Sequence, residues 1–133
     1  MVDDGETFSR FDALAGIRLK EATPDRVVAV VPVTPRLHQA YGIVHGGVYA
    51  TLVETVGSYG AALWLGGRGR TVGISNYTEF LRAVRDGDLV AEATPLARGQ
   101  TLQSWEVSVT DGQGRLVAHG RVRLMNLPAG GSR

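Results

Sequence analysis

The sequence contains no cysteine and carries almost no net charge, and each absence excludes whole classes of function. Without cysteine the chain has no disulfide, no thiolate nucleophile and no Cys-ligated zinc or iron–sulfur site. Fourteen Lys and Arg residues against thirteen Asp and Glu residues leave a formal net charge of +1. That balance gives no electrostatic basis for binding nucleic acid or an anionic membrane, and we expect neither as a partner.

Long hydrophobic runs are also missing. The longest weakly charged stretch, residues 46–67, is interrupted by glycines and hydroxyl side chains and has one carboxylate near its middle. A membrane span needs about 20 mostly apolar residues. The amino terminus, MVDDGETFSR, is acidic and polar and lacks the basic-then-apolar pattern of a secretory signal. Together with the missing cysteines, these features predict a cytoplasmic protein.

The length of 133 residues and a hydrophobic fraction of 44% are typical of one globular domain. We expect a single domain over residues 1–133, with an N-terminal extension over 1–25 and a flexible tail over 128–133. Hydrophobic periodicity predicts a weak helix over 8–20, a strand over 26–33 and a long helix over 47–65. Period-two patterns predict strands over 71–81, 89–96, 101–110 and 116–124. This order predicts an α+β fold, with an antiparallel sheet of five or six strands wrapped around one helix.

The long helix reverses the usual pattern of an apolar stripe on a polar surface. Its polar side chains lie at i, i+3, i+4 and i+7, on a single face: Thr51, Glu54, Thr55 and Ser58. Glu54 is the only charge, and no Lys or Arg is placed to pair with it, as a solvated stripe would have. We therefore expect the helix to be buried nearly all round, with Glu54 as an acid or base lining a pocket.

The loop before this helix reads HQAYGIVHGG over residues 38–47. Two successive glycines entering a helix leave backbone N–H groups unobstructed, with the positive end of the helix dipole behind them. Such a terminus can polarise a carbonyl oxygen. Gly47 and Glu54 would lie ~10 Å apart along the axis, at ~1.5 Å per residue, so a bound acyl group or a second subunit must bridge them.

These motifs resemble the signature of hotdog-fold thioesterases of the phenylacetate-degradation type. That signature has Asn or Gln, then Gly, then His-Gly-Gly, then an acidic residue on the helix, as in Gln39, Gly42, residues 45–47 and Glu54. Residues 76–82 (NYTEFLR) and the hairpin over 111–118 resemble two further elements of the family, and the likeness covers about residues 26–124. The combination of Glu54 with Gln39 resembles the 4-hydroxybenzoyl-CoA thioesterase subgroup, which uses a glutamate.

The resemblance implies hydrolysis of an acyl-CoA thioester without a metal or a separate cofactor, since coenzyme A is part of the substrate. By this likeness Glu54 is the nucleophile or general base, and Ser58 positions the water. The N–H of Gly46 polarises the thioester carbonyl, and Gln39 orients the acyl carbonyl or the water. In the family the site forms between two subunits. We expect a dimer and a tetramer of two dimers, because one chain of 133 residues with a short, thin sheet can hardly cover both faces of a nearly all-apolar helix.

Six further residues are candidates for binding substrate, several of them at coenzyme A phosphates: His45, Gly47, Asn76, Arg82, Gly99 and Thr101. His45 is more often a structural hydrogen-bonding residue in this motif than a catalytic one. His38, His45 and His119 have no metal-ligand spacing, so no metal site is expected. The resemblance favours aryl or arylacetyl substrates. Five aromatic side chains are available either for such a pocket or, equally, for the core: Tyr41, Tyr49, Tyr59, Trp64 and Phe80.

Three other functions remain open. A dehydratase or hydratase acting on 3-hydroxyacyl or enoyl thioesters would use the same helix amide, with an essential histidine. A non-catalytic acyl-CoA-binding protein is the second alternative, although residues 1–25 are too short and acidic for the DNA-binding segment that such sensors carry. A purely structural oligomerisation domain is the third, and a buried Glu54 would argue against it.

Overall fold

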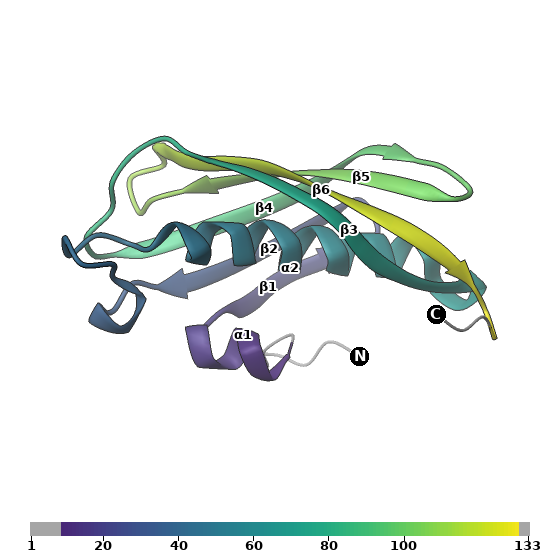
Figure 1. Cartoon of the computed structure of the whole chain (residues 1–133), viewed down its shortest axis with the longest axis horizontal. Coiled ribbons are helices and arrows are strands. Elements are labelled where there is room, and N and C mark those ends of the chain that lie inside the picture. Colours follow the sequence, from purple (N-terminus) through teal and green to yellow (C-terminus); the bar gives the residue numbers. More distant parts are fainter. Residues whose placement is uncertain (1–8, 131–133) are drawn as a thin grey trace.

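The computed structural model describes residues 9–130 and shows one antiparallel sheet curved around a long helix (Figure 1). In chain order the helices and strands are α1 (Arg10–Ala15), β1 (Arg18–Thr23), β2 (Arg26–Pro32), α2 (Gly46–Leu65), β3 (Gly69–Phe80), β4 (Asp88–Arg98), β5 (Leu102–Thr110) and β6 (Leu116–Pro128). Short 3-10 turns lie at Pro35–Leu37 and Gly66–Arg68. The expected α+β architecture is confirmed.

The six strands are ordered β1-β2-β4-β5-β6-β3, and every neighbouring pair is antiparallel. The strands expected after α2 are confirmed, and β3 and β1 form the two edges of the sheet. The helix expected over residues 8–20 is shorter than predicted, because Gly16 ends α1 in the left-handed conformation with φ of 81°. The prediction was wrong for Arg18–Thr23, which form β1 beside β2 and add a strand inside the expected extension.

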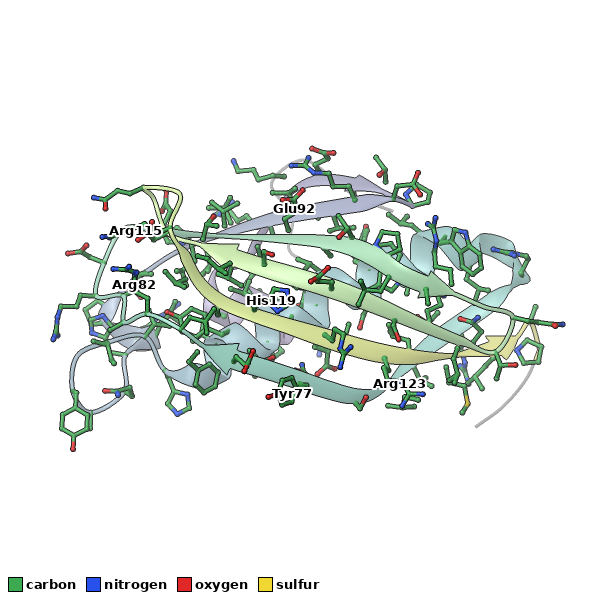
Figure 2. All side chains as sticks on the ribbon, turned by 90° about the horizontal axis from the view of Figure 1, so that it is seen from above. Tyr77, Arg82, Glu92, Arg115, His119 and Arg123 are labelled. Carbon is green, nitrogen blue, oxygen red and sulfur yellow. The ribbon has the colours of Figure 1, made fainter. Side chains whose placement is uncertain are left out.

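The core lies between α2 and the concave face of the sheet. Side chains of α2 that face the sheet are fully buried, among them Leu52, Val53 and Val56, and they meet the buried Trp105 and Val122. The opposite face of the sheet carries polar and charged side chains, including Glu92, His119 and Arg123 (Figure 2). Apolar side chains on one face and polar side chains on the other are expected for an antiparallel sheet with one covered face.

Glycines let α2 approach the sheet closely. A Cβ atom added to Gly60 would lie 2.5 Å from the Trp105 ring, and one added to Gly57 would lie 2.3 Å from a Val122 methyl group. Both distances are well inside van der Waals contact, so no larger residue fits without movement. The helix ends at Leu65, and Gly66 with φ of 59° follows it, as the Gly-Gly pair predicted.

Two remaining expectations concern the termini and the membrane. Pro128, expected in a flexible tail, is the last residue of β6 and pairs with Gly69, whereas residues 1–8 and 131–133 lie outside the described part. Among residues 9–130, no helix combines the length and hydropathy that a bilayer crossing requires.

Candidate functional site

The polar face of α2 opens into a cavity of about 480 Å³, which we call the Glu54 cavity. Its lining residues are Ser9, Phe11, Asp12, Thr51, Glu54, Thr55, Ser58, Tyr59 and Ala62. The prediction that the four polar residues share one face is confirmed, and Glu54 and Ser58 lie in one cavity. The expectation that Glu54 is buried was wrong for a single chain, because the sheet covers only the other side of α2 and leaves Glu54 exposed.

Helix α1 forms the outer wall of the Glu54 cavity through Asp12. The Asp12 side chain is 4% exposed; it accepts hydrogen bonds from the Thr55 hydroxyl at 2.8 Å and the Ser9 hydroxyl at 2.7 Å. A buried carboxylate needs such donors. Asp12 was not predicted as a site residue, although the Ser-x-x-Asp helix start at Ser9 is a signal present in the sequence.

The amino-terminal end of α2 lines a second cavity of about 290 Å³, which we call the Gly46 cavity. It is bounded by Gln39, Ile43, Val44, Gly46, Tyr49, Phe80, Leu81, Arg82 and Ala83. His45 caps the helix, because its Nδ1 accepts a hydrogen bond from the Gly47 N–H at 2.8 Å. The expectation that the Gly47 N–H is free was therefore wrong, while the Gly46 N–H has no hydrogen-bond partner among residues 9–130.

Gln39 is held in the Gly46 cavity by its own loop. Its side-chain oxygen accepts a hydrogen bond from the Tyr41 N–H, and its backbone N–H donates to Ile43 at 2.8 Å. Gly42 lies in the turn between Gln39 and Ile43 and has φ of 78°, a left-handed conformation that favours glycine. Arg82 lies in the same cavity, on the segment that follows β3. The structure thus brings Gln39, Gly46 and Arg82 together, as the motif implies.

Within one chain the two cavities do not merge. Gly46 and Glu54 are eight residues apart on α2, which corresponds to ~12 Å along the axis at ~1.5 Å per residue, and they line different cavities. A carbonyl oxygen bound at Gly46 is therefore out of reach of Glu54 of the same chain. This separation agrees with the expectation that a second subunit is needed.

Three of the expected binding residues, Asn76, Gly99 and Thr101, lie outside both helix cavities. Asn76 donates from its side chain to the Ala50 carbonyl at 2.9 Å and accepts from the Thr78 hydroxyl at 2.7 Å, so it ties β3 to α2. This geometry gives Asn76 a structural role within the single chain, and it lines neither cavity.

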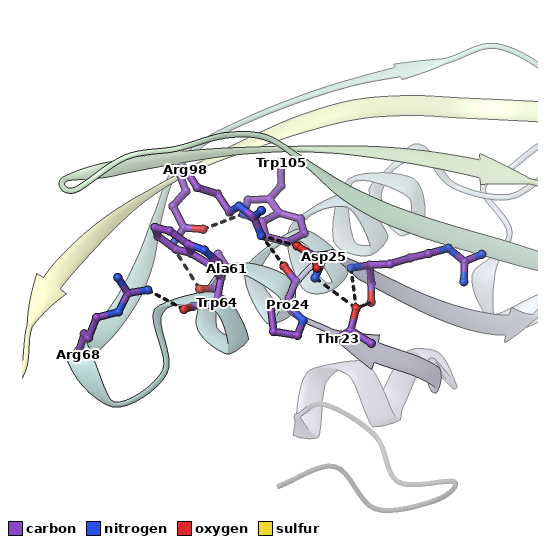
Figure 3. Close-up of polar contacts among 10 residues, drawn as sticks. Thr23, Pro24, Asp25, Ala61, Trp64, Arg68, Arg98 and Trp105 are labelled. Carbon is purple, nitrogen blue, oxygen red and sulfur yellow. Dashed lines mark hydrogen bonds and ion pairs between the residues drawn. The ribbon is translucent and has the colours of Figure 1, made fainter.

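Gly99 and Thr101 lie at the opposite end of α2, beside a third cavity of about 740 Å³ that also touches Trp64, Arg68 and Arg98. The Arg68 guanidinium lies 4.5 Å from the centre of the Trp64 ring, and that of Arg98 lies 5.4 Å from it (Figure 3). Arg98 also donates to the Pro24 carbonyl at 2.8 Å and pairs with Asp25 at 2.9 Å. These contacts already engage both arginines.

The aromatic side chains expected in one pocket are distributed among three cavities and one exposed loop. Tyr49 and Phe80 line the Gly46 cavity, Tyr59 lines the Glu54 cavity and Trp64 lines the third, while Tyr41 is 83% exposed on its loop. Burial raises the pKa of the Tyr49 phenol above its ordinary value of 10.0. Its hydroxyl has no hydrogen-bond partner, which costs about 1–3 kcal/mol for a buried polar group.

Among residues 9–130, no group of three or more His, Asp or Glu side chains is arranged to hold a metal ion. His38 contacts the Arg85 carbonyl through Nε2 at 2.8 Å, and His119 contacts Glu106 at 2.7 Å, so the three histidines are engaged separately. The Glu54 cavity offers two carboxylates, Asp12 and Glu54, together with hydroxyl groups, and the Gly46 cavity offers a backbone amide, the Gln39 side-chain amide and the Arg82 guanidinium.

Comparison with known proteins shows the family to which the chain belongs. A family model described as the thioesterase superfamily matches residues 41–118, more than half of the chain, which include the start of α2 and Glu54. The chain belongs to the thioesterase superfamily. The structure of a candidate esterase from Mycobacterium tuberculosis superimposes with a TM-score of 0.89 at 42% identity, covering 91% of this chain and 98% of that one. The hotdog fold implied by the motifs is thereby confirmed.

Two relatives of this thioesterase-superfamily chain carry functional names. The 1,4-dihydroxy-2-naphthoyl-CoA hydrolase of Escherichia coli is 31% identical over 106 residues, covering 80% of this chain and 78% of that protein. The proofreading thioesterase EntH of Cronobacter turicensis is 36% identical over 100 residues, covering 75% and 73%. These names support assignment of the chain as a hydrolase.

Proposed function

We propose that the protein hydrolyses an acyl-CoA thioester to the free acid and coenzyme A at a site shared by two copies of the chain. One copy supplies the Gly46 cavity and the other supplies the Glu54 cavity. The observation that carries this proposal is the pairing of a carboxylate and a hydroxyl, Glu54 and Ser58, in a cavity on α2 of a thioesterase-superfamily fold.

In this mechanism the Gly46 N–H donates to the thioester carbonyl oxygen at the positive end of the α2 dipole. Gln39 orients the acyl carbonyl or the water. Glu54 of the other copy acts in one of two ways. As a general base it takes a proton from water, whose oxygen adds to the carbonyl carbon; the C–S bond then breaks, and the departing thiolate takes that proton from Glu54. As a nucleophile it adds to the carbonyl carbon itself, the C–S bond breaks to leave an acyl anhydride on Glu54 and a thiolate that takes a proton from water, and a second water then hydrolyses the anhydride to the free acid. Ser58, one turn from Glu54, positions the water.

We further propose that aryl or arylacetyl thioesters are preferred, as in the phenylacetate-degradation type and the glutamate-using subgroup. The naphthoyl-CoA substrate named for the Escherichia coli relative supports an aromatic acyl group. Thiol release from phenylacetyl-, hydroxybenzoyl-, short-chain and medium-chain acyl-CoAs tests this proposal. We expect the aryl substrates to give the highest kcat/KM. A preference for long aliphatic chains over every aryl thioester would overturn the substrate assignment.

Self-association follows from the divided site. The edge strand β3 is 12 residues long and, among the described strands, pairs only with β6, so the backbone of its other edge is available for pairing with another strand. We propose a dimer, a tetramer of two dimers and a cytoplasmic location. Sedimentation equilibrium at micromolar concentration tests the assembly, and a stable monomer would contradict the shared site.

The dehydratase alternative requires a catalytic histidine in the Gly46 region. His45 instead accepts a hydrogen bond from the Gly47 N–H as a helix cap, which favours a structural role. His45→Asn keeps a capping side chain and removes the imidazole. We expect thioester hydrolysis to stay within about threefold of wild type, because asparagine is among the preferred N-cap residues. Full activity of this variant would exclude the dehydratase, whereas a wild-type dehydration of 3-hydroxyacyl thioesters that His45→Asn abolishes with an intact fold would favour it.

A further inference from the structure

Packing within the free chain does not explain why residue 49 carries a hydroxyl group. Tyr49 is 3% exposed, and its Oη is the one buried side-chain nitrogen or oxygen of residues 9–130 that has no hydrogen-bond partner. Phenylalanine would fill nearly the same volume without leaving a buried donor unsatisfied. A buried polar atom without a partner therefore calls for a partner that is absent from the free chain.

The position of Tyr49 identifies where that partner binds. Tyr49 lies one turn after Gly46 on α2, and both residues line the Gly46 cavity. Long side chains on a helix lean toward its amino terminus, so the Tyr49 ring lies over the first turn. The Gly46 N–H also has no partner among the described residues. Gly46 and Tyr49 thus line one cavity, and within the described part of the chain each has an unsatisfied donor, one on the backbone and one on the side chain.

Phe80 lies against both residues. Its ring centroid is 5.9 Å from that of Tyr49, and its ring carbons lie 2.5 Å from the place a Cβ on Gly46 would occupy. Phe80 is nevertheless 60% exposed, because it is the last residue of the edge strand β3. A surface side chain at a strand end can change rotamer without disturbing the core. Rotation of Phe80 would open space beside Gly46 and the Tyr49 ring.

The chemistry of the two donors defines their ligand. Burial raises the Tyr49 pKa, so the phenol is a neutral hydrogen-bond donor at neutral pH and cannot act as a base there. Two neutral donors in a mostly apolar cavity fit one acceptor oxygen on which negative charge develops. In thioester hydrolysis that atom is the carbonyl oxygen, which becomes an oxyanion when the nucleophile adds.

We propose that the Tyr49 hydroxyl is a catalytic residue that donates to the acyl carbonyl oxygen beside the Gly46 N–H, after Phe80 moves aside. This inference rests on the proposed hydrolysis of acyl-CoA and assigns it a second oxyanion donor. The bond is made more strongly in the tetrahedral intermediate than in the bound substrate, so it accelerates the chemical step.

Tyr49→Phe tests the assignment, with Tyr77→Phe as the matched control. Tyr77 undergoes the same chemical change but is 64% exposed on β3 and lies outside both helix cavities. We expect Tyr49→Phe to lower kcat by at least about tenfold with KM changed less than threefold, while Tyr77→Phe retains wild-type kcat. A purely structural hydroxyl would change the unfolding midpoint and leave kcat unchanged, and that result would overturn the assignment.

A pair of unreactive ligands separates this inference from the proposed function. An S-(2-oxoalkyl)-CoA ketone presents a carbonyl oxygen, and the S-alkyl-CoA thioether of the same length does not. By calorimetric titration, we expect Tyr49→Phe to weaken the ketone about two- to threefold, in keeping with the small change in KM, and to leave the affinity for the thioether unchanged. Equal effects on both ligands would overturn the role of Tyr49 alone. A wild-type chain that binds neither ligand and hydrolyses no thioester would instead contradict the proposed function.

Discussion

The two faces of α2 are built on opposite principles. On the face toward the sheet, Gly57 and Gly60 leave room for Val122 and Trp105, and no added atom fits. On the other face, Thr51, Glu54 and Ser58 line a cavity of about 480 Å³. The first face determines how closely the helix and sheet pack, whereas the second contributes almost no packing and carries the reactive groups. Stability and activity should therefore respond to different substitutions within one helix.

Replacing Glu54 should give the largest effect on activity. Glu54→Gln keeps the shape of the side chain and removes the carboxylate. We expect kcat to fall at least ~10²-fold, the lower end for loss of a general base, with KM changed much less. Because Glu54 is exposed in the single chain, its neutralisation should leave the unfolding midpoint of the fold nearly unchanged. Thiol-release kinetics and urea denaturation measure the two quantities.

Wild-type turnover in Glu54→Gln would remove the centre of the proposed mechanism and favour an acyl-CoA-binding protein without catalysis. A large loss of stability together with activity would show instead that the two faces are not separable. The glycine substitutions on the opposite face provide the reciprocal test.

Gly60→Ala should reduce stability and spare the chemistry. The added Cβ would lie 2.5 Å from a Trp105 ring that is fully buried and donates through Nε1 to Gln103 at 2.8 Å. Because that hydrogen bond fixes the indole, overpacking should cost about 1–3 kcal/mol of the free energy of unfolding. Gly67→Ala is the matched control, since nothing lies within 4 Å of its added Cβ. Urea denaturation that shows equal stability for both variants would contradict the close approach.

Gln39 and Ser58 should contribute less than Glu54. Gln39→Ala removes a side chain of the Gly46 cavity, and we expect about a tenfold fall in kcat/KM, equivalent to ~1.4 kcal/mol. Ser58→Ala should cost about threefold, because water can be held by Glu54 alone. Neither side chain packs against the sheet, since Ser58 lines the Glu54 cavity and Gln39 the Gly46 cavity, so stability should change little. The ranking fails if Ser58→Ala reduces kcat/KM more than Glu54→Gln does.

The sequence predicted the sheet-facing side of α2 better than the open side. Regular spacing and the flanking glycines were sufficient to predict the helix, and alternation predicted the strands after it. Strand β1 was missed because a bulge between Leu19 and Glu21 interrupts its alternation, which leaves only a Leu and an Ala facing inward. Local pattern carries no signal for such an edge strand, which depends on pairing with β2.

The candidate site was predictable as a set of residues but not as an arrangement. The motif named Gln39, Gly46 and Glu54, yet their division between two cavities depends on how far the sheet curves around α2. The roles of Asp12 and Tyr49 were not predicted. Asp12 binds Thr55, which is 43 residues away in the sequence, and the Tyr49 hydroxyl has no hydrogen-bond partner in the described part of the chain. Contacts of that kind become visible only in the folded chain.

The smallest expected effect is a pH dependence on the sheet-facing side. Because burial raises the Tyr49 pKa above 10.0, the folded chain holds the phenolic proton more tightly than the unfolded chain does. Its contribution to stability is complete below pH ~10 and is lost as the pH rises through the folded-state pKa. Wild type should therefore lose stability more steeply than Tyr49→Phe as the pH rises above about 10, as measured by urea midpoints at successive pH values. Tyr77→Phe, which alters an exposed tyrosine, should follow the wild-type curve. Parallel curves for wild type and Tyr49→Phe would mean that the hydroxyl is solvated in solution, and the distinction between the packed and open faces of α2 would not extend to its first turn.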